Sequence, residues 1–165
     1  MIRTLVFLAI FFGSVRAQAA EVCFTPGDDC TSLVVRELGA AKKTVRVQAY
    51  SFTSAPIAKA LVDASHRGVR VEVILDRSNR TGRYSGLTFL TNAAVPTSID
   101  AKHAIAHNKV MIIDEATVIT GSFNFTKAAQ EHNAENLLVL RDAGLAAKYT
   151  ANWRKHLAHS EDAER

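Results

Sequence analysis

The sequence lacks the features that mark a membrane-spanning, repetitive or strongly charged chain. Its first apolar run, residues 5–12, is too short to cross a bilayer as a helix, and the chain has no internal repeat and no low-complexity linker. The 165 residues include 20 basic and 16 acidic side chains. This mild excess of positive charge allows a polyanionic substrate but does not identify one. The length and an apolar fraction of 48% fit one domain with one packed core.

The first 19 residues have the organisation of a secretory signal peptide. Arg3 gives a basic start, the apolar run follows, and the small residues of Ala17-Gln18-Ala19 predict cleavage near residue 19 or 20. An uncleaved anchor is the alternative. Cleavage leaves residues 20–165 as a single domain with 18 basic and 16 acidic side chains, a net charge of +2. The signal predicts an exported protein, periplasmic or secreted, with no stable membrane association after cleavage.

Only two cysteines are present, Cys23 and Cys30, and they flank a Pro-Gly pair. In an exported chain, an even number of closely spaced cysteines favours a disulfide, which would fix the N-terminus of the mature protein. A metal site at these cysteines is the alternative, but no pair of histidines lies near them to complete the ligand set.

Apolar periodicity predicts an α/β domain. Residues 45–52 and 69–76 alternate as strands and flank a helical pattern at 57–66, which indicates a strand-helix-strand unit with parallel pairing. The remaining patterns predict helices at 31–41, 87–94 and 144–156, strands at 96–99, 106–113, 117–121 and 135–140, and a loop at 77–86. The predicted fold is a mixed, largely buried sheet with helices on both faces.

The most informative segment runs from His107 to Asn124. His107 and Lys109 lie two residues apart on a predicted strand, so their side chains project from the same face. Further along, Ser122 and Asn124 follow a glycine that permits close approach to a ligand. An imidazole, an ammonium, a hydroxyl and an amide are the groups that attack a phosphodiester and hold its oxygens. The pattern occurs once, so a reaction that needs it twice requires a second chain.

Two carboxylates belong to the same prediction. Asp114 has the opposite strand parity to His107, which favours a role in bracing the turn between two strands over contact with the reacting phosphorus. Glu135 stands in an otherwise apolar strand and needs a partner if buried. That partner is either a nitrogen of His107, whose tautomer it would fix, or a structural arginine. His132 is expected on the surface.

Metal ligation by His107 is disfavoured because Lys109 places a cation on the same face. The sequence also has neither His-Glu-x-x-His nor Asp-x-Asp. We therefore expect no metal and no cofactor in the reaction.

The spacing His107-x-Lys109-x4-Asp114-x6-Gly121-Ser122-x-Asn124 resembles the signature of the phospholipase D superfamily. Residues 47–54, 57–61, 67–69 and 134–136 are similar to the small secreted bacterial endonucleases of that superfamily. The resemblance implies an α/β/α sandwich and a homodimer whose active site lies across the two-fold axis. It also implies metal-independent, sequence-nonspecific hydrolysis of DNA.

The resemblance implies a role for each site residue. His107 of one chain would attack phosphorus to form a phosphohistidine, while His107 of the second chain protonates the leaving oxygen and then activates water. Lys109 and Asn124 would bind the phosphate oxygens, with Ser122 supporting this pocket. Glu135 would orient His107, and the motif's Asp114 would belong to the same catalytic unit.

The substrate class stays open at this point, because the superfamily includes phospholipases and phosphatidyltransferases as well as nucleases. Arg77, Arg80 and Arg83 favour a nuclease if they lie along the backbone of DNA or RNA, although a solvated polar loop explains them equally well. A phospholipase D acting on phosphatidyl lipids is the second hypothesis, against which we find no aromatic-rich apolar loop or amphipathic anchor. A DNA-binding protein without turnover is the third.

Overall fold

The computed structural model describes residues 20–81 and 85–163, so the predicted signal peptide and Arg83 lie outside the described residues. These residues form an 8-stranded mixed sheet in the order β1-β7-β6-β5-β2-β3-β4-β8. The strands are β1 (Ala20–Thr25), β2 (Thr44–Ala49), β3 (Arg70–Asp76), β4 (Thr97–Asp100), β5 (Lys109–Ile113), β6 (Thr117–Gly121), β7 (Glu135–Arg141) and β8 (Glu161–Asp162). The helices are α1 (Cys30–Ala40), α2 (Ala55–His66), the short 3-10 helix η1 (Arg77–Arg80), α3 (Leu87–Asn92), α4 (Lys127–Glu131) and α5 (Ala143–Leu157).

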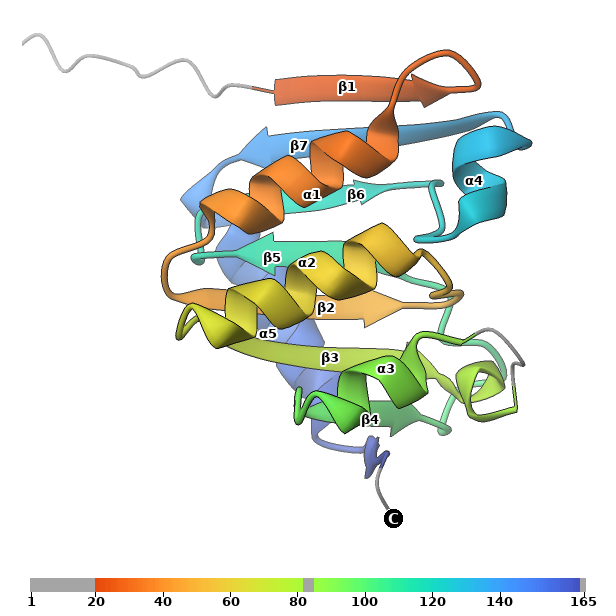
Figure 1. Ribbon diagram of the computed structural model, residues 1–165. Helices are drawn as coiled ribbons and strands as arrows, with labels where there is room; N and C mark the ends of the chain where they lie inside the picture. Colours follow the sequence, from red (N-terminus) through yellow and green to blue (C-terminus); the bar gives the residue numbers. More distant parts are fainter. Residues whose placement is uncertain (1–19, 82–84, 164–165) are drawn as a thin grey trace, which may run out of the picture.

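The layers are those of the predicted α/β fold. Figure 1 shows α1, α2 and α3 on one face of the sheet and α5 on the other. β2 and β3 pair in parallel around α2, which confirms the strand-helix-strand unit. Pro56 lies in the first turn of α2, where its missing N–H loses no helical bond, and Gly68 turns the chain after the helix with φ at 86°.

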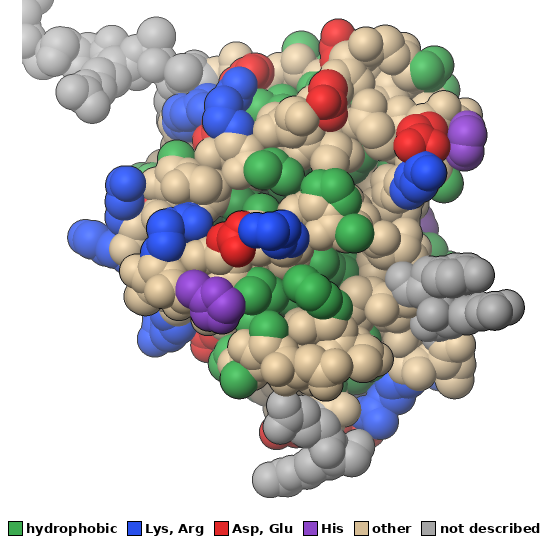
Figure 2. Space-filling view, in the orientation of Figure 1, with side chains coloured by type: hydrophobic (Ala, Val, Ile, Leu, Met, Phe, Trp, Pro, Cys, Tyr) green, Lys and Arg blue, Asp and Glu red, His purple; other side chains and the backbone are tan. Residues whose placement is uncertain are grey.

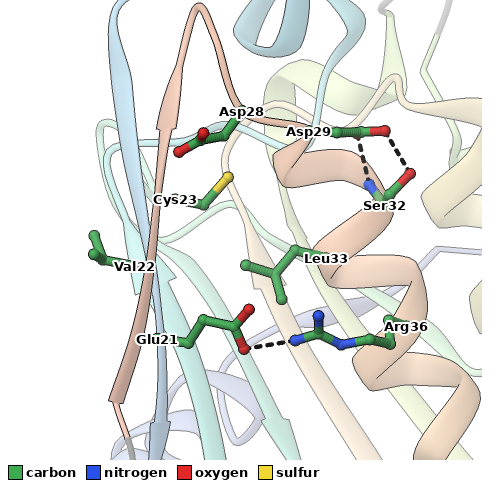
Figure 3. A pocket seen from close by; sticks show the side chains of 8 residues that line it. All are labelled: Glu21, Val22, Cys23, Asp28, Asp29, Ser32, Leu33 and Arg36. Atoms are coloured by element: carbon green, nitrogen blue, oxygen red, sulfur yellow. Dashed lines mark hydrogen bonds and ion pairs between the residues drawn. The ribbon is translucent and has the colours of Figure 1, made fainter.

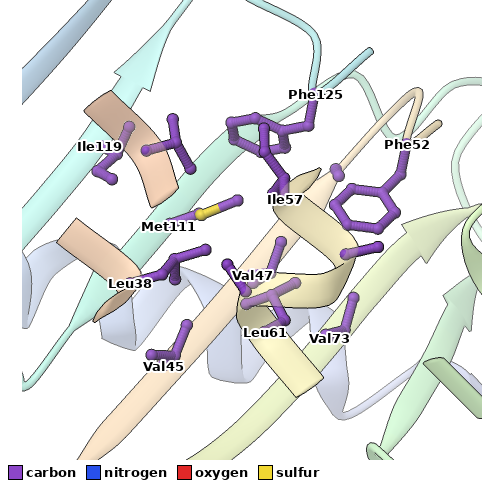
Figure 4. Close-up of a cluster of buried hydrophobic side chains, with 14 of the residues drawn as sticks. Leu38, Val45, Val47, Phe52, Ile57, Leu61, Val73, Met111, Ile119 and Phe125 are labelled. Atoms are coloured by element: carbon purple, nitrogen blue, oxygen red, sulfur yellow. The ribbon is translucent and has the colours of Figure 1, made fainter. Parts of the chain in front are cut away.

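Side chains alternate between two hydrophobic clusters, one on each face of the sheet. Met111 and Ile113 pack in the larger cluster with α1 and α2, which Figure 4 shows in part. Val110 and Ile112 point the other way and pack with Trp153 of α5, whose indole N–H donates to the Val47 carbonyl at 2.9 Å. The predicted period of two along this strand is therefore correct.

The structure differs from the prediction at several element ends. β2 stops at Ala49, three residues early, because the chain turns away from the sheet so that Phe52 bridges to Phe125. β5 begins at Lys109 and not at residue 106, so His107 lies in the preceding loop. The sequence did not predict β1, α4, η1 or β8. β1 was missed because its large apolar side chains, Val22 and Phe24, are exposed.

The predicted disulfide is present between Cys23 of β1 and Cys30 of α1, with the two Cα atoms 5.7 Å apart. It ties the edge strand to the first helix, whose N-terminus is capped by Asp29 through the amide of Ser32 at 2.9 Å. Within residues 20–81 and 85–163, no helix combines the length and apolarity needed to cross a bilayer.

Candidate active site

The candidate site lies where the parallel strands end. β2, β3 and β4 run in the same direction, so their carboxyl ends meet at one edge of the sheet, on the right in Figure 1. β5 runs against β2 and begins at the same edge, where Lys109 pairs with Ala49. This register brings the loop before β5, with His107, next to Tyr50 at the end of β2.

His107 and Lys109 are in direct contact. The Lys109 Nζ lies 3.0 Å from the His107 Nε2 and 3.1 Å from the His107 carbonyl oxygen. The lysine is only 7% exposed, whereas the imidazole is exposed to solvent. Tyr50 flanks both groups, with its ring centroid 4.6 Å from the imidazole and 5.1 Å from Nζ. A reachable imidazole is thus held beside a fixed amine.

The protonation of Lys109 is set by two opposing effects. Burial lowers the pKa of the Lys109 amine below its usual range, and the negative charge of Glu135 partly offsets that effect. When the amine is charged it donates to Nε2, which makes Nε2 an acceptor and leaves the imidazole proton on Nδ1. The contact therefore selects one tautomer of His107.

The loop that carries His107 is fixed by buried polar contacts. The Asp76 carboxylate, which is buried, accepts from the Ala106 amide at 2.7 Å. The Tyr50 amide donates to the Asn108 carbonyl at 2.9 Å. These bonds hold the backbone on both sides of His107, so the imidazole sits on a restrained segment although it lies outside a strand.

A second part of the site forms where β6 ends. The amides of Ser122 and Phe123 donate to the Asn136 carbonyl at 3.1 and 3.2 Å, and the Asn136 amide donates to the Ser122 Oγ at 3.0 Å. Gly121 has φ at 148°, and a Cβ at this position would collide with the Asn136 carbonyl oxygen. The glycine of the motif is thus required by the close approach of β7, and the serine beside it accepts a hydrogen bond from that strand.

The Asn124 amide is available to a ligand. Its Oδ1 is buried and has no hydrogen-bond partner among the residues that the structure describes. A buried acceptor without a partner is unfavourable in the free protein, and a phosphate oxygen cannot satisfy it because that oxygen is also an acceptor. The group of Asn124 that can bind a phosphate oxygen is its NH2, which donates. Within the described chain, no hydrogen bond joins Asn124 to His107 or Lys109.

Asp114 lies at the opposite end of β5 from His107. Its carboxylate accepts from the amides of Lys42, Lys43 and Thr44 at 2.9, 2.7 and 2.9 Å. Burial opposes ionisation of Asp114, but these three bonds outweigh it and hold the pKa of the carboxyl below its usual range. Within one chain, this aspartate fastens the β5–β6 turn to the segment between α1 and β2.

The expected hydrogen bond between Glu135 and His107 is not formed within the chain. Glu135 begins β7, and β6 separates that strand from β5. Its side chain is only partly buried, and its Oε1 accepts from the Asn133 amide at 2.9 Å. The negative charge of Glu135 raises the pKa of Lys109 without a hydrogen bond between the two side chains. Lys109, and not Glu135, contacts the His107 Nε2.

The arginines after β3 are engaged with the protein. Arg77 donates to the Ala104 carbonyl at 3.1 Å, and Arg80 pairs with Glu161 at 2.7 Å. In Figure 2, basic and acidic side chains are interspersed over the face that α1, α2 and α3 cover. The described residues therefore do not present the predicted arginine track as a set of free cations.

Two other regions of the described chain hold clustered charged or metal-ligating side chains. The hollow between β1 and α1, shown in Figure 3, is lined by charged groups that pair with each other, such as Arg36 with Glu21 at 2.6 Å. It holds no imidazole and no lysine. The metal-ligating side chains that converge in the described chain are Asp100, His103, His156 and His159, and they do not include His107.

Comparison with known proteins assigns the family. Residues 34–157 match the family model described as cardiolipin synthase, PLD-like domain. The chain belongs to the phospholipase D superfamily. This membership makes it a phosphodiesterase and confirms the resemblance that the motif indicated.

Superfamily members of known sequence and structure are close to this chain. The phospholipase D of Rickettsia bellii is 45% identical over 140 residues, which cover 85% of this chain and 70% of that protein. The Rickettsia typhi phospholipase D is 47% identical over 133 residues, 81% of this chain and 65% of that protein. The chain thus spans about two thirds of these relatives.

Solved structures of the superfamily match over almost their whole length. The structure of Nuc from Salmonella typhimurium has a TM-score of 0.85 and 38% identity, covering 88% of this chain and 98% of Nuc. NucT from Helicobacter pylori has a TM-score of 0.81 and 27% identity, covering 88% of this chain and 99% of NucT. The α/β architecture is therefore that of known superfamily members.

The sequence did not indicate two residues that the structure brings to the site. Tyr50 was assigned to a continuous strand, and its contact with His107 depends on the turn that the chain makes after Ala49. Asn136 lies in the predicted strand 135–140 and in a segment that resembles the superfamily, but its bonds to Ser122 depend on the pairing of β6 with β7. Both contacts join segments far apart in the chain, and no local spacing encodes them.

Proposed function

We propose that this protein is a metal-independent endonuclease that hydrolyses the phosphodiester bonds of DNA with little sequence specificity. The observation that carries the proposal is the exposed His107 imidazole beside the buried Lys109 amine, with Nε2 and Nζ 3.0 Å apart. This pair combines a nucleophile with a fixed charge for a phosphate oxygen, so a metal ion is not needed for either task. The near-complete coverage of Nuc and NucT supports a nucleic-acid substrate.

The chemistry proceeds by two displacements at phosphorus. A His107 nitrogen forms a bond to phosphorus while the bond to the leaving oxygen breaks, and that oxygen takes a proton from the second His107. Water then attacks the phosphorus of the phosphohistidine and gives a proton to the second His107. The bond between phosphorus and the His107 nitrogen breaks as the new P–O bond forms, which releases the phosphate monoester end and regenerates the free imidazole. Lys109 moves its hydrogen bond from Nε2 to a non-bridging oxygen, which frees the Nε2 lone pair. Asn124 and the loop of Ser122 complete the oxygen contacts.

The same mechanism requires a homodimer. One chain supplies a single His107, and the reaction uses one imidazole as nucleophile and another as acid and base. In a two-fold symmetric dimer the partner subunit contributes the same residues to the site, so the two imidazoles face one phosphorus. Unfolding and refolding wild-type protein with an excess of His107→Ala chains tests this arrangement. If the site is shared, a wild-type chain paired with a His107→Ala chain is inactive, so the activity per wild-type chain should fall in the mixture. An activity per wild-type chain that stays the same would contradict a shared site.

Plasmid cleavage in excess EDTA is the test of the function. We expect nicked and linear products from the wild-type protein, no products from His107→Ala, and unchanged activity from the control His132→Ala, whose side chain is 73% exposed and outside the site. Intact plasmid at every pH would refute a nuclease. Binding of DNA without cleavage would identify the third possibility, a DNA-binding protein without turnover.

A phospholipase D acting on phosphatidyl lipids is the second candidate. The Rickettsia relatives carry that name, and Ile105 is 55% exposed only two residues before His107, where an apolar side chain can contact lipid. The lipase would be favoured if the protein releases head groups from phosphatidylcholine vesicles and leaves DNA intact. In that case Ile105→Ser should reduce the release of head groups.

We also propose that the mature protein is periplasmic or secreted, beginning near residue 20. The Cys23–Cys30 disulfide supports an oxidising compartment. N-terminal sequencing of protein recovered from the periplasm or medium should begin near residue 20, and recovery of a chain that retains residues 1–19 in the membrane fraction would indicate an anchor.

A further inference from the structure

Four potential metal ligands converge at the end of β4, away from the catalytic motif. Asp100 is the last residue of β4 and His103 follows it, while His156 belongs to the last turn of α5 and His159 lies just beyond. One oxygen of Asp100, Oδ2, is 3.0 Å from the His103 Nδ1, 2.7 Å from the His156 Nδ1 and 3.4 Å from the His159 Nε2. All four ligand atoms lie within 4.8 Å of one another.

The three imidazoles face one another with near three-fold regularity. Their ring centroids are 5.0 Å apart for His103 and His156, 5.2 Å for His103 and His159, and 5.4 Å for His156 and His159. A tetrahedral zinc ion at 2.0–2.1 Å from each ring nitrogen would place the centroids roughly 5.2 Å apart and the ligand atoms about 3.3 Å apart. The ring centroids already have this spacing. The ligand atoms, which lie within 4.8 Å of one another, would have to adjust to about 3.3 Å, with Asp100 Oδ2 moving about 0.6 Å away from the nearest nitrogen.

Hydrogen bonds within the cluster do not satisfy every member. His103 and His156 both have Nδ1 within hydrogen-bond distance of the Asp100 carboxylate. The His159 Nε2 is buried and makes no hydrogen bond to any residue that the structure describes. The Asp100 side chain is itself fully buried. One cation at the centre would give the His159 Nε2 a closer partner than its 3.4 Å contact with the Asp100 Oδ2, and it would neutralise the buried carboxylate.

We propose that Asp100, His103, His156 and His159 form a binding site for one divalent transition-metal ion, zinc in the first instance. Three imidazoles and one carboxylate are a nitrogen-rich set that suits zinc and disfavours magnesium or calcium, which prefer oxygen ligands. Four protein ligands close the tetrahedral shell, so the ion has a structural role and no open position for substrate.

The site would stabilise the loop that carries His107. Residues 101–108 connect the Asp100 end of the cluster to β5, and the Asp76 carboxylate already holds this loop at Ala106. The metal would fix its other end to the C-terminus of α5. A structural ion is compatible with cation-independent chemistry, because none of its four ligands belongs to the catalytic motif. This proposal does not depend on the identity of the phosphodiester substrate.

The test uses full-length mature protein without a histidine tag, stripped with a chelator and dialysed. Titration with Zn²⁺ should reach one ion per chain by elemental analysis, and Co²⁺ should give the intense visible absorption of a tetrahedral site. At a Zn²⁺ concentration about 100-fold above Kd, the melting temperature should rise by about 5–10 °C.

Variants separate this site from adventitious zinc binding. His103→Gln changes the most exposed ligand, at 43% exposure, and is the variant least expected to disturb the fold. It should weaken zinc binding at least about 10-fold, and His156→Gln with His159→Gln should abolish the Co²⁺ spectrum. His132→Gln, which replaces an exposed histidine outside the cluster, should leave both unchanged.

Three results would overturn the proposal. The first is wild-type protein that binds less than about 0.1 ion per chain in excess Zn²⁺. The second is zinc binding that is equal in the wild type and in the double variant with native circular dichroism. The third is a melting temperature that Zn²⁺ does not change, which would identify a purely hydrogen-bonded cluster. Each of these results is read from metal binding or from the melting temperature and none from DNA cleavage, so the two proposals fail independently.

Discussion

Replacement of Asp114 by asparagine distinguishes structural support from direct catalysis for the motif's aspartate. The Asp114 carboxylate accepts from the amides of Lys42, Lys43 and Thr44 at the end of β5 that is far from His107. An asparagine oxygen can keep the two bonds to Oδ1, but its NH2 group would face the Lys42 amide. One charge-assisted bond is lost and two are weakened, so we expect the free energy of unfolding to fall by about 1–2 kcal/mol.

The pH dependence of this difference follows from the lowered pKa of Asp114. A carboxyl whose pKa is lower in the folded state stabilises the protein above its unfolded pKa, about 3.9. This stabilisation is lost as the pH falls through the folded pKa. The stability gap between wild type and Asp114→Asn should therefore be full at pH 7 and should shrink below about pH 4.

Urea denaturation at pH 7 and pH 3 measures the stability, and plasmid cleavage at 25 °C measures the activity. The matched control is Asp142→Asn, which removes a carboxylate that accepts from the amides of Gly144 and Leu145 at the start of α5. Asp114→Asn should be less stable than wild type, whereas Asp142→Asn can keep both of its bonds through the amide oxygen and should change the stability little. Both should retain kcat within about 3-fold of wild type, a change of under 1 kcal/mol in the barrier. A fully folded Asp114→Asn that loses activity about 100-fold or more, while Asp142→Asn does not, would refute the structural role.

Three other changes give separate tests. Glu135→Gln removes the negative charge that partly offsets the lowered pKa of Lys109, so that pKa should fall further and the alkaline limb of the pH–rate profile should move to lower pH. An unchanged limb would contradict an electrostatic effect of Glu135 on Lys109. Reduction of the disulfide between Cys23 and Cys30, seven residues apart, should lower the free energy of unfolding by about 2–3 kcal/mol in urea. Gly121→Ala should destabilise by at least about 2 kcal/mol, since φ is 148° and the new Cβ would collide with a carbonyl of β7; equal stability would exclude that collision.

Much of the fold could be predicted because its patterns are local. Apolar and polar side chains alternate along β2 and β3, Pro56 marks the start of α2, and Gly68 follows its end. These signals are conformational preferences of short segments. β1 could not be found in this way, because its large apolar side chains, Val22 and Phe24, face solvent, whereas the pattern assumes that such side chains face the core. Its place at the sheet edge depends on pairing with β7 and on the disulfide.

The superfamily motif was visible because its residues are close in sequence. Strand parity predicted that His107 and Lys109 share a face, and the two side chains are in contact although His107 lies in the loop before β5. The partners of Glu135 were not predictable, because they depend on β6 lying between β5 and β7. The metal-ligand cluster was hidden for the same reason. It consists of two short spacings, Asp100-x-x-His103 and His156-x-x-His159, that only the packing of α5 against β4 brings together.

The most direct measurement of the proposed mechanism is mass spectrometry of protein quenched during cleavage of a DNA oligonucleotide. The account predicts a covalent nucleotide on a nitrogen of His107, stable in alkali and labile in acid, that decays at the rate of product release and is absent from His107→Gln. Cleavage by the wild-type protein with no adduct at any time, or with an adduct on another residue, would contradict a phosphohistidine intermediate.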